Sequence, residues 1–157
     1  MITLIITKSE KVQEAFLNSV KKLRTQGVCV LLVKSYSAIA GLLAKNSVKT
    51  SNFLFIDTLS SSELDNVIYV PQEDLTGLSI SISAALQSLP EKAALVFDSF
   101  STLSIKHDSK VVAKFARFLS QRLHYWKTEA VIIVAKESTD PELLAVLKQS
   151  VDKVEEK

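Results

Sequence analysis

Short runs of consecutive apolar residues alternate along the chain with longer stretches in which apolar residues recur every three or four positions. The short runs are typical of strands covered on both faces, and the longer stretches are typical of helices with one apolar side. The predicted strands are 2–7, 28–33, 53–57, 66–70, 93–98 and 130–135, with the charged segment 152–156 as a candidate edge strand. The predicted helices lie between residues 9 and 27, at 36–45, between residues 74 and 90, from 109 to about 127, and from 141 to 151.

Cap residues indicate where several of these helices begin and end. The first helix is predicted to be capped by Thr7 or Ser9 and to be followed by Gly27 as its C-terminal glycine. Asp140 and Pro141 have the side chains that favour the N-cap and first turn of the last helix. In the long helix, the spacing predicts an inward face made of Val111, Phe115, Phe118, Leu119 and Trp126.

Strands and helices alternate from one end of the sequence to the other, without an internal repeat or a low-complexity linker. Such alternation is the pattern of parallel strands joined by helical crossovers. The sequence therefore predicts one domain over residues 1–157. Its fold class is α/β, a three-layer α/β/α sandwich with a mostly parallel sheet.

The composition narrows the class of protein further. The 157 residues are 47% hydrophobic and 23% charged, which is ordinary for a globular protein and excludes a disordered chain. With 19 basic and 17 acidic residues the net charge is +2, so charge alone favours neither nucleic acid nor a membrane. The single cysteine, Cys29, lies in an apolar run and indicates a reducing, cytoplasmic location. No apolar run approaches the roughly 18 residues that a membrane helix needs.

Candidate chemistry gathers where two predicted strands end. Asp57 closes the strand 53–57, and Asp98 closes the apolar strand 93–98 and is followed by Ser99. The carboxyl ends of strands are the edge where open α/β sheets bind ligands. These three residues could be a remnant metal or ligand site, or Asp98 could accept hydrogen bonds from loop N–H groups and shape the strand end.

Other kinds of site have little support in the sequence. His107 and His124 have no partner at ligand spacing, so a zinc site is not expected. No serine lies in a Gly-x-Ser-x-Gly turn, and Cys29 is predicted to be inert within its strand. The sequence therefore supports neither a serine hydrolase nor a thiol enzyme.

Residues 96–103, Val-Phe-Asp-Ser-Phe-Ser-Thr-Leu, resemble the Walker B strand of RecA-like ATPases, in particular of the KaiC-like branch common in archaea. Residues 53–57, 74–80 and 142–154 resemble further stretches of that branch in the same order. The resemblance implies a P-loop NTPase fold. It also implies that Asp98 stands where the family's aspartate helps to hold the magnesium of bound ATP.

Two departures from that family change the expected function. The turn at residues 7–12 has no glycine, since the three glycines are Gly27, Gly41 and Gly77, so it cannot wrap phosphate with its N–H groups. Lys8 and Ser9 remain a possible contact for an anion at the helix start. The family's catalytic acidic pair is replaced by Lys34 and Ser35, which cannot serve as a general base. We therefore expect a degenerate domain without ATP hydrolysis, enzyme activity or a cofactor.

The main hypothesis is a protein-interaction or regulatory module that binds a protein partner or forms a homo-oligomer. The alternative is residual nucleotide or small-ligand binding at the sheet edge through Asp57, Asp98 and Ser99. A minor alternative is nucleic-acid binding through a basic-polar stripe on the long helix, although solvated helix faces show this pattern more often. The stripe consists of Lys110, Lys114, Arg117, Gln121 and His124.

Overall fold

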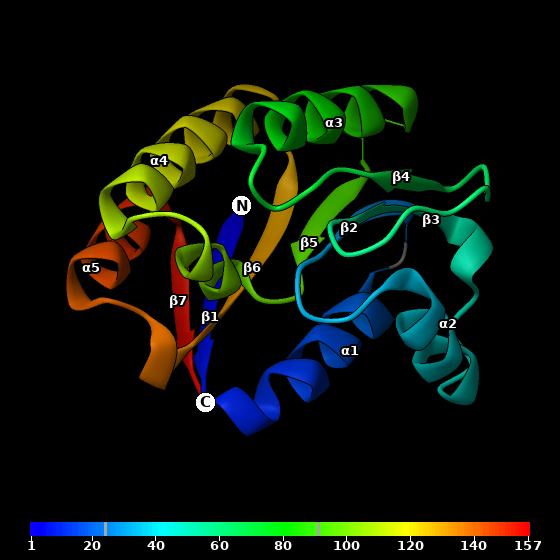
Figure 1. Ribbon diagram of the computed structural model, residues 1–157, viewed down its shortest axis with the longest axis horizontal. Helices are drawn as coiled ribbons and strands as arrows, with labels where there is room; N and C mark the ends of the chain where they lie inside the picture. Colours follow the sequence, from blue (N-terminus) through cyan, green and yellow to red (C-terminus); the bar gives the residue numbers. More distant parts are fainter. Residues whose placement is uncertain (24, 91) are drawn as a thin grey trace.

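The structure is a computed structural model that describes residues 1–23, 25–90 and 92–157 (Figure 1). In the described residues seven strands form one sheet in the order β4-β3-β2-β5-β6-β1-β7, and every recorded strand pairing is parallel. The strands are β1 (Ile2–Thr7), β2 (Gly27–Leu31), β3 (Phe53–Asp57), β4 (Val67–Tyr69), β5 (Ala94–Phe97), β6 (Glu129–Ala135) and β7 (Lys153–Glu156). The predicted α/β class with a parallel sheet is confirmed.

Helices cover both faces of this sheet. The α-helices are α1 (Val12–Lys22), α2 (Tyr36–Lys45), α3 (Leu75–Ser88), α4 (Ser109–Tyr125) and α5 (Pro141–Ser150). Short 3₁₀ helices are η1 (Ser9–Lys11), η2 (Thr50–Asn52), η3 (Phe100–Ile105) and η4 (Lys136–Ser138). Figure 1 shows α1 and α2 on one side of the sheet and α3, α4 and α5 on the other.

The apolar runs in the strands follow from this two-sided cover. In β2, Val28 and Val30 pack into the core under α3 and α4, whereas Cys29 and Leu31 pack into the core under α1 and α2. Successive side chains of a strand point to opposite faces, so a strand with two covered faces needs apolar residues at every position. Burial in apolar surroundings strongly raises the pKa of the Cys29 thiol, which leaves it protonated and unreactive.

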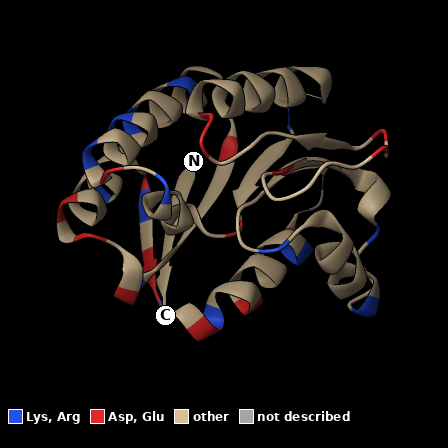
Figure 2. Cartoon of the chain, in the orientation of Figure 1, with Lys and Arg blue, Asp and Glu red and all other residues tan. Residues whose placement is uncertain are grey.

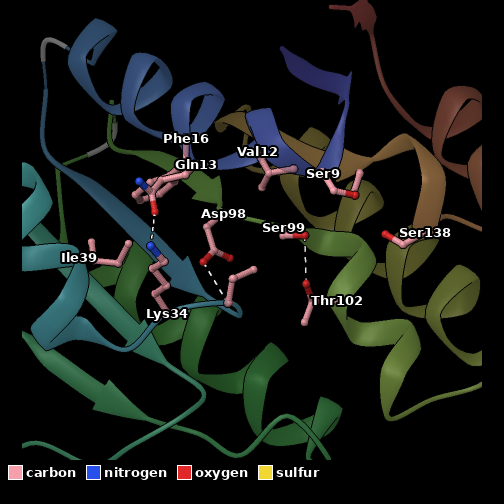
Figure 3. A pocket seen from close by; sticks show the side chains of 12 residues that line it. Ser9, Val12, Gln13, Phe16, Lys34, Ile39, Asp98, Ser99, Thr102 and Ser138 are labelled. Carbon is pink, nitrogen blue, oxygen red and sulfur yellow. Dashed lines mark hydrogen bonds between the residues drawn. The ribbon is translucent and has the colours of Figure 1, made fainter.

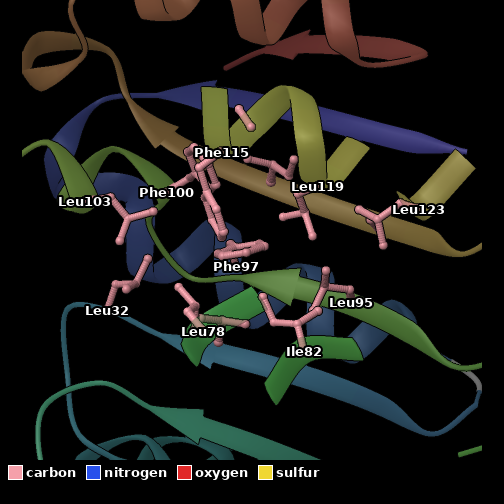
Figure 4. Close-up of a cluster of buried hydrophobic side chains, with 14 of the residues drawn as sticks. Leu32, Leu78, Ile82, Leu95, Phe97, Phe100, Leu103, Phe115, Leu119 and Leu123 are labelled. Atoms are coloured by element: carbon pink, nitrogen blue, oxygen red, sulfur yellow. The ribbon is translucent and has the colours of Figure 1, made fainter. Parts of the chain in front are cut away.

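Three aromatic rings lie at the centre of the core under α3 and α4 (Figure 4). The rings of Phe97 and Phe100 meet edge to face with centroids 5.1 Å apart, and Phe100 stacks on Phe115 at 6.0 Å. Phe97 ends β5, Phe100 begins η3 and Phe115 lies in α4. This packing fixes the segment that follows β5, and with it Asp98.

Three sequence-based expectations about local structure are wrong. Gly27 does not follow a helix C-terminus, because α1 ends at Lys22 and Gly27 is the first residue of β2. The second strand ends at Leu31 rather than at Val33. Neither Thr7 nor Ser9 caps the first helix, because η1 and α1 follow Lys8 and Lys11 and no side chain caps either of them.

The inward face of α4 also differs from the prediction. Phe115 and Leu119 are buried as expected, but Val111 and Phe118 are 43% and 44% exposed. Trp126 follows the helix and is half-buried. The residues of α4 that are buried are Val112, Phe115, Ala116, Leu119, Ser120 and Leu123. The true face is therefore rotated by about one position relative to the predicted one.

The predicted edge strand at the C-terminal end of the sequence is confirmed. β7 pairs in parallel with β1, with Thr3 opposite Lys153 and Ile6 opposite Glu156. The charges of β7 suit an edge, because charged side chains discourage pairing with another chain.

Candidate functional site

Asp98 lies directly after β5 and is only 4% exposed. Its Oδ1 accepts the backbone N–H of Leu32 at 2.8 Å, and its Oδ2 accepts that of Val33 at 3.2 Å. These two N–H groups belong to the first residues after β2. Because they donate to a side chain, they do not extend the sheet, which explains why β2 stops at Leu31.

Burial and hydrogen bonding shift the pKa of Asp98 in opposite directions. Desolvation raises the pKa of Asp98, the N–H groups of Leu32 and Val33 partly counter that rise, and the net result is a pKa of about 6 in place of 3.8. The carboxylate is thus mostly ionised at neutral pH. Its negative charge is stabilised by backbone dipoles of the connection between β2 and α2.

Asp57 ends β3 and is 1% exposed. Its Oδ2 accepts the N–H of Tyr36, the first residue of α2, at 2.8 Å. Its Oδ1 accepts the N–H groups of Leu59 at 2.9 Å and Ser60 at 3.2 Å. Asp57 therefore caps α2 and shapes the loop after β3.

The two carboxylates hold opposite ends of one connection. Residues 32–35 join β2 to α2; Asp98 binds the N–H groups at the start of this segment, and Asp57 binds the first N–H of the helix that follows. In the sheet, β2 lies between β3 and β5. Asp57 and Asp98 thus stand on either side of β2 and do not share one cavity.

A buried polar network holds the same connection from a third side. The side-chain nitrogen of Gln72 donates to the carbonyl of Leu32 at 2.7 Å and to Oγ1 of Thr58 at 3.0 Å. Thr58 Oγ1 in turn donates to the carbonyl of Leu31 at 2.7 Å. His107 Nε2 lies 2.7 Å from the carbonyl oxygen of Gln72. Sequence reasoning missed Gln72, because its burial depends on the fold and a glutamine after Pro71 carries no signal for it.

The hydroxyl groups after Asp98 bind one another and β6. Thr102 Oγ1 donates to Ser99 Oγ at 3.0 Å, and Ser99 Oγ lies 3.3 Å from Ser101 Oγ. Ser101 Oγ accepts the N–H of Ala135, the last residue of β6, at 3.1 Å. Ser99 thus belongs to a chain of hydroxyl groups that joins η3 to β6.

Ser9, a candidate anion contact, donates its backbone N–H to a carboxylate of the same chain. The two oxygens of Glu137 accept this N–H at 3.1 and 3.2 Å. Glu137 lies in η4, directly after β6, and β6 is the sheet neighbour of β1. Hydrogen bonds from backbone N–H groups, its own and that of Ser9, hold the pKa of Glu137 below its ordinary value, with Lys8 nearby contributing in the same direction.

A cavity of about 340 Å³ opens at this edge of the sheet, between α1, the connection 32–35, η3 and η4 (Figure 3). It brings together three of the candidate residues, Asp98, Ser99 and Ser9, and does not include Asp57 or Lys8. Its lining residues are Ser9, Val12, Gln13, Phe16, Val33, Lys34, Ile39, Asp98, Ser99, Thr102, Ala135 and Ser138.

In the described part of the chain, no group of three or more His, Cys, Asp and Glu side chains could hold a metal ion. None of the described helices has both the length and the apolar character needed to cross a bilayer.

The basic-polar stripe predicted on α4 is exposed. Figure 2 shows the Lys and Arg positions of this helix in blue. Lys110, Lys114 and Gln121 point away from the core, whereas Arg117 lies 3.4 Å from the side chain of Gln149 in α5. His124 Nε2 lies 3.0 Å from Asp152 Oδ2. The seventeen residues of α4 include no Asp or Glu.

Comparison with known proteins agrees with this architecture. A sequence family described as "Family of unknown function (DUF7504)" matches residues 47–156. No curated protein matches the sequence.

Three solved structures share the fold at low sequence identity. The KaiC-like protein PH0186 of Pyrococcus horikoshii OT3 has a TM-score of 0.72 and 12% identity, over 98% of this chain and 70% of that one. The uncharacterised protein PH0321 of Pyrococcus horikoshii, solved in complex with an unknown peptide, has a TM-score of 0.75 and 12% identity, over 98% and 75%. The flagellar accessory protein FlaH of Methanocaldococcus jannaschii has a TM-score of 0.65 and 12% identity, over 99% and 70%.

Proposed function

The chain belongs to the family of unknown function DUF7504, and from that premise we propose that it is a KaiC-like domain that does not hydrolyse ATP and acts as a protein-interaction module. The KaiC-like architecture is shared with the solved structures. The absence of hydrolysis and the interaction role are our proposals, and each is argued below from separate contacts.

The observation that carries the proposal is the bond between Glu137 and Ser9. A nucleotide-binding turn must offer its backbone N–H groups to phosphate oxygens. Here the N–H of Ser9 is donated to both oxygens of Glu137 at 3.1 and 3.2 Å. A phosphate approaching this turn would have to displace a carboxylate and would be repelled by its charge. The glycine-free segment 7–12 cannot wrap it in any other way.

The roles of Asp57 and Asp98 support the same proposal. Both carboxylates hold the connection between β2 and α2, where the resemblance would place a catalytic acidic pair. That connection carries Lys34 and Ser35 instead, and a lysine ammonium cannot accept a proton from an attacking water. The acids that remain at this edge thus have structural tasks.

The exposed face of α4 supports binding to a protein. Val111, Phe118 and Tyr125 are spaced seven residues apart and are 43%, 44% and 83% exposed. They lie beside Lys110 and Lys114 on a helix that has no acidic residue. Exposed apolar groups next to cations fit a partner surface that combines acidic and apolar side chains. The peptide bound by PH0321 is a property of that protein, and it makes a peptide-binding role for this fold reasonable.

Hydrolysis is tested with the purified full chain and ATP, with and without magnesium. We expect phosphate release at the level of a buffer blank and no heat of binding in calorimetry. Magnesium-dependent release well above the blank from the purified chain would overturn the proposal.

The interaction role is tested by capture from native lysate with the wild type and a Lys110→Glu/Lys114→Glu variant. We expect the wild type to capture acidic proteins that salt releases. The α4 variant should not capture them, whereas a control variant, Lys45→Glu/Lys49→Glu, at and just after the end of α2, should capture them like the wild type. Light scattering shows whether the partner bound by this face of α4 is instead a second copy of the chain. Salt-sensitive binding of a labelled oligonucleotide, lost with the α4 variant, would instead establish the nucleic-acid alternative.

A further inference from the structure

The cavity beside Asp98 has the size and place of a small-molecule site. Its volume of about 340 Å³ falls within the roughly 300–1,000 Å³ of ligand pockets. It opens at the carboxyl ends of β2, β5 and β6, because Val33, Asp98 and Ala135 stand at or just beyond those strand ends. This edge is where α/β sheets bind ligands.

One wall of the cavity is apolar. Val12 and Phe16 reach it from α1, and Ile39 reaches it from α2 (Figure 3). Phe16 and Ile39 are 1% and 2% exposed, so these side chains are held in place by the core beneath them. Such a wall suits a compact hydrocarbon group. The apolar surface removed from water would be mainly that of the ligand and of the half-exposed Val33 at the rim, and burying apolar surface is favourable by about 25 cal/mol per Å².

The opposite wall carries hydrogen-bond acceptors. Figure 3 shows Ser99, Thr102 and Ser138 on the side of Asp98 away from Ile39. Each oxygen of Asp98 accepts one backbone N–H, and an ionised carboxylate oxygen can accept a second bond. One buried carboxylate beside several hydroxyl oxygens matches a group with several N–H donors and a positive charge.

The buried charge of the cavity lining disfavours an anion. Asp98 is 4% exposed and lies within the lining, whereas Glu137 lies outside the lining, binds Ser9 and has Lys8 nearby. The cation among the described lining residues is Lys34, which is exposed and donates its ammonium group to the side chain of Gln13. The buried carboxylate would therefore attract an ammonium ligand, whereas it would repel a triphosphate, which is also negatively charged.

We propose that this cavity binds a compact primary amine, with the ammonium group on Asp98 and the hydrocarbon body against Phe16 and Ile39. This site is separate from the protein-binding face on α4. Failure of amine binding and failure of protein binding by α4 are therefore distinguishable.

The test uses 3-methylbutylamine and 2-phenylethylamine as probes, with 3-methylbutanol and 3-methylbutanoate as neutral and anionic analogues of the first. Binding to the full chain is followed by the backbone amide NMR signals of Leu32 and Val33, which donate to Asp98. We expect both amines to shift these signals, the alcohol to bind about tenfold more weakly, and the carboxylate not to bind. Equal binding of amine and alcohol, or no binding of either amine, would overturn the proposal.

Two variants locate the binding. Asp98→Asn removes the charge, and we expect it to abolish the preference for the amine over the alcohol. Because Asp98→Asn could also disturb folding, Val33→Trp is made at the half-exposed rim to fill the cavity, and we expect it to abolish binding. Val154→Trp, at a similarly exposed position on β7 outside the lining, is the control and should bind like the wild type. Amine binding that Val33→Trp leaves unchanged would contradict this location. ATP binding that shifts the same signals would contradict both this proposal and the proposed absence of nucleotide chemistry.

Discussion

Asp98 and Asp57 hold the two ends of one four-residue connection. Asp98 accepts the N–H groups of Leu32 and Val33 where the connection leaves β2, and Asp57 accepts the N–H of Tyr36 where α2 begins. Acidic residues at strand ends are a familiar sign of a metal or nucleotide site, but here each carboxylate oxygen accepts at least one backbone N–H. The contribution of each residue to the stability of the fold can therefore be tested by substitution.

Replacing Asp98 by Asn is predicted to change how stability depends on pH. Burial raises the pKa of Asp98 to about 6 in the folded protein, compared with an ordinary value of 3.8. The folded state then holds this proton more tightly, so the contribution of Asp98 to stability is full below about pH 4 and is lost as pH rises through about 6. The shift corresponds to at most about 3 kcal/mol.

Urea unfolding of the wild type and Asp98→Asn at about pH 4 and pH 7.5 measures this effect. We expect the destabilisation caused by the substitution to be larger at the lower pH, by about 2–3 kcal/mol. All other titrating groups are common to both proteins. A difference in free energy that stays constant with pH would show that Asp98 does not titrate with a raised pKa.

Replacing Asp57 by Ala is predicted to cost about 2–4 kcal/mol of the free energy of unfolding, because three N–H groups lose their acceptor in a buried site. Asp140→Ala is a matched control, since Asp140 caps α5 through one exposed bond to the N–H of Glu142 at 2.8 Å. That loss should cost about 1 kcal/mol. Denaturant unfolding measures the loss of unfolding free energy in both variants. Equal losses would mean that Asp57 acts only as a helix cap.

Replacing Glu137 by Gln is predicted to lower the melting temperature at neutral pH. The N–H bonds from its own backbone and from Ser9 hold the pKa of Glu137 below its ordinary value of 4.5. A carboxyl group with a lowered pKa contributes stability above its ordinary pKa and loses it as pH falls through the lower folded value. The difference between wild type and variant should thus shrink at about pH 3. Calorimetry at both pH values tests this, with Glu10→Gln as an exposed control on the neighbouring η1.

The local pattern of apolar and polar residues was enough to locate most of the helices and strands. Residues 53–57 were predicted and observed as β3, and residues 36–45 as α2. Both faces of this sheet are covered, and strands of such a sheet are expected to be apolar runs without alternation. The β7 edge strand was predicted from residues 152–156 and is observed at Lys153–Glu156.

The face of α4 could not be predicted in the same way. The helix has apolar residues on its exposed side as well as on its buried side. Several sets of positions three or four residues apart therefore fit an apolar face equally well. α4 packs on the sheet and beside α5, and in this placement Val112 is buried in the core while Val111 is exposed. A pattern within one helix does not contain that information.

The contacts of the candidate site depend on sheet order. Ser9 and Glu137 are 128 residues apart in sequence and meet because β1 lies beside β6. Asp98 meets Leu32 because β5 lies beside β2. The sequence identified Asp98 and Ser9 as candidates from their own positions, but it gave no signal for Glu137, whose role depends on a distant strand.

The last prediction concerns the edge strand β7 and its attachment to β1. Asp152 Oδ2 accepts the backbone N–H of Ile2 at 2.7 Å and lies 3.0 Å from His124 Nε2, so this side chain joins the start of β7 to β1 and α4. Asp152→Ala removes both contacts, and we expect amide hydrogen exchange of Lys157, which donates to Ile6, to accelerate by about tenfold. His124→Ala keeps the bond to Ile2 and should have a smaller effect. Exchange in β3, on the other half of the sheet, should not change in either variant. Unchanged exchange at Lys157 in Asp152→Ala would show that backbone pairing alone holds β7 in place.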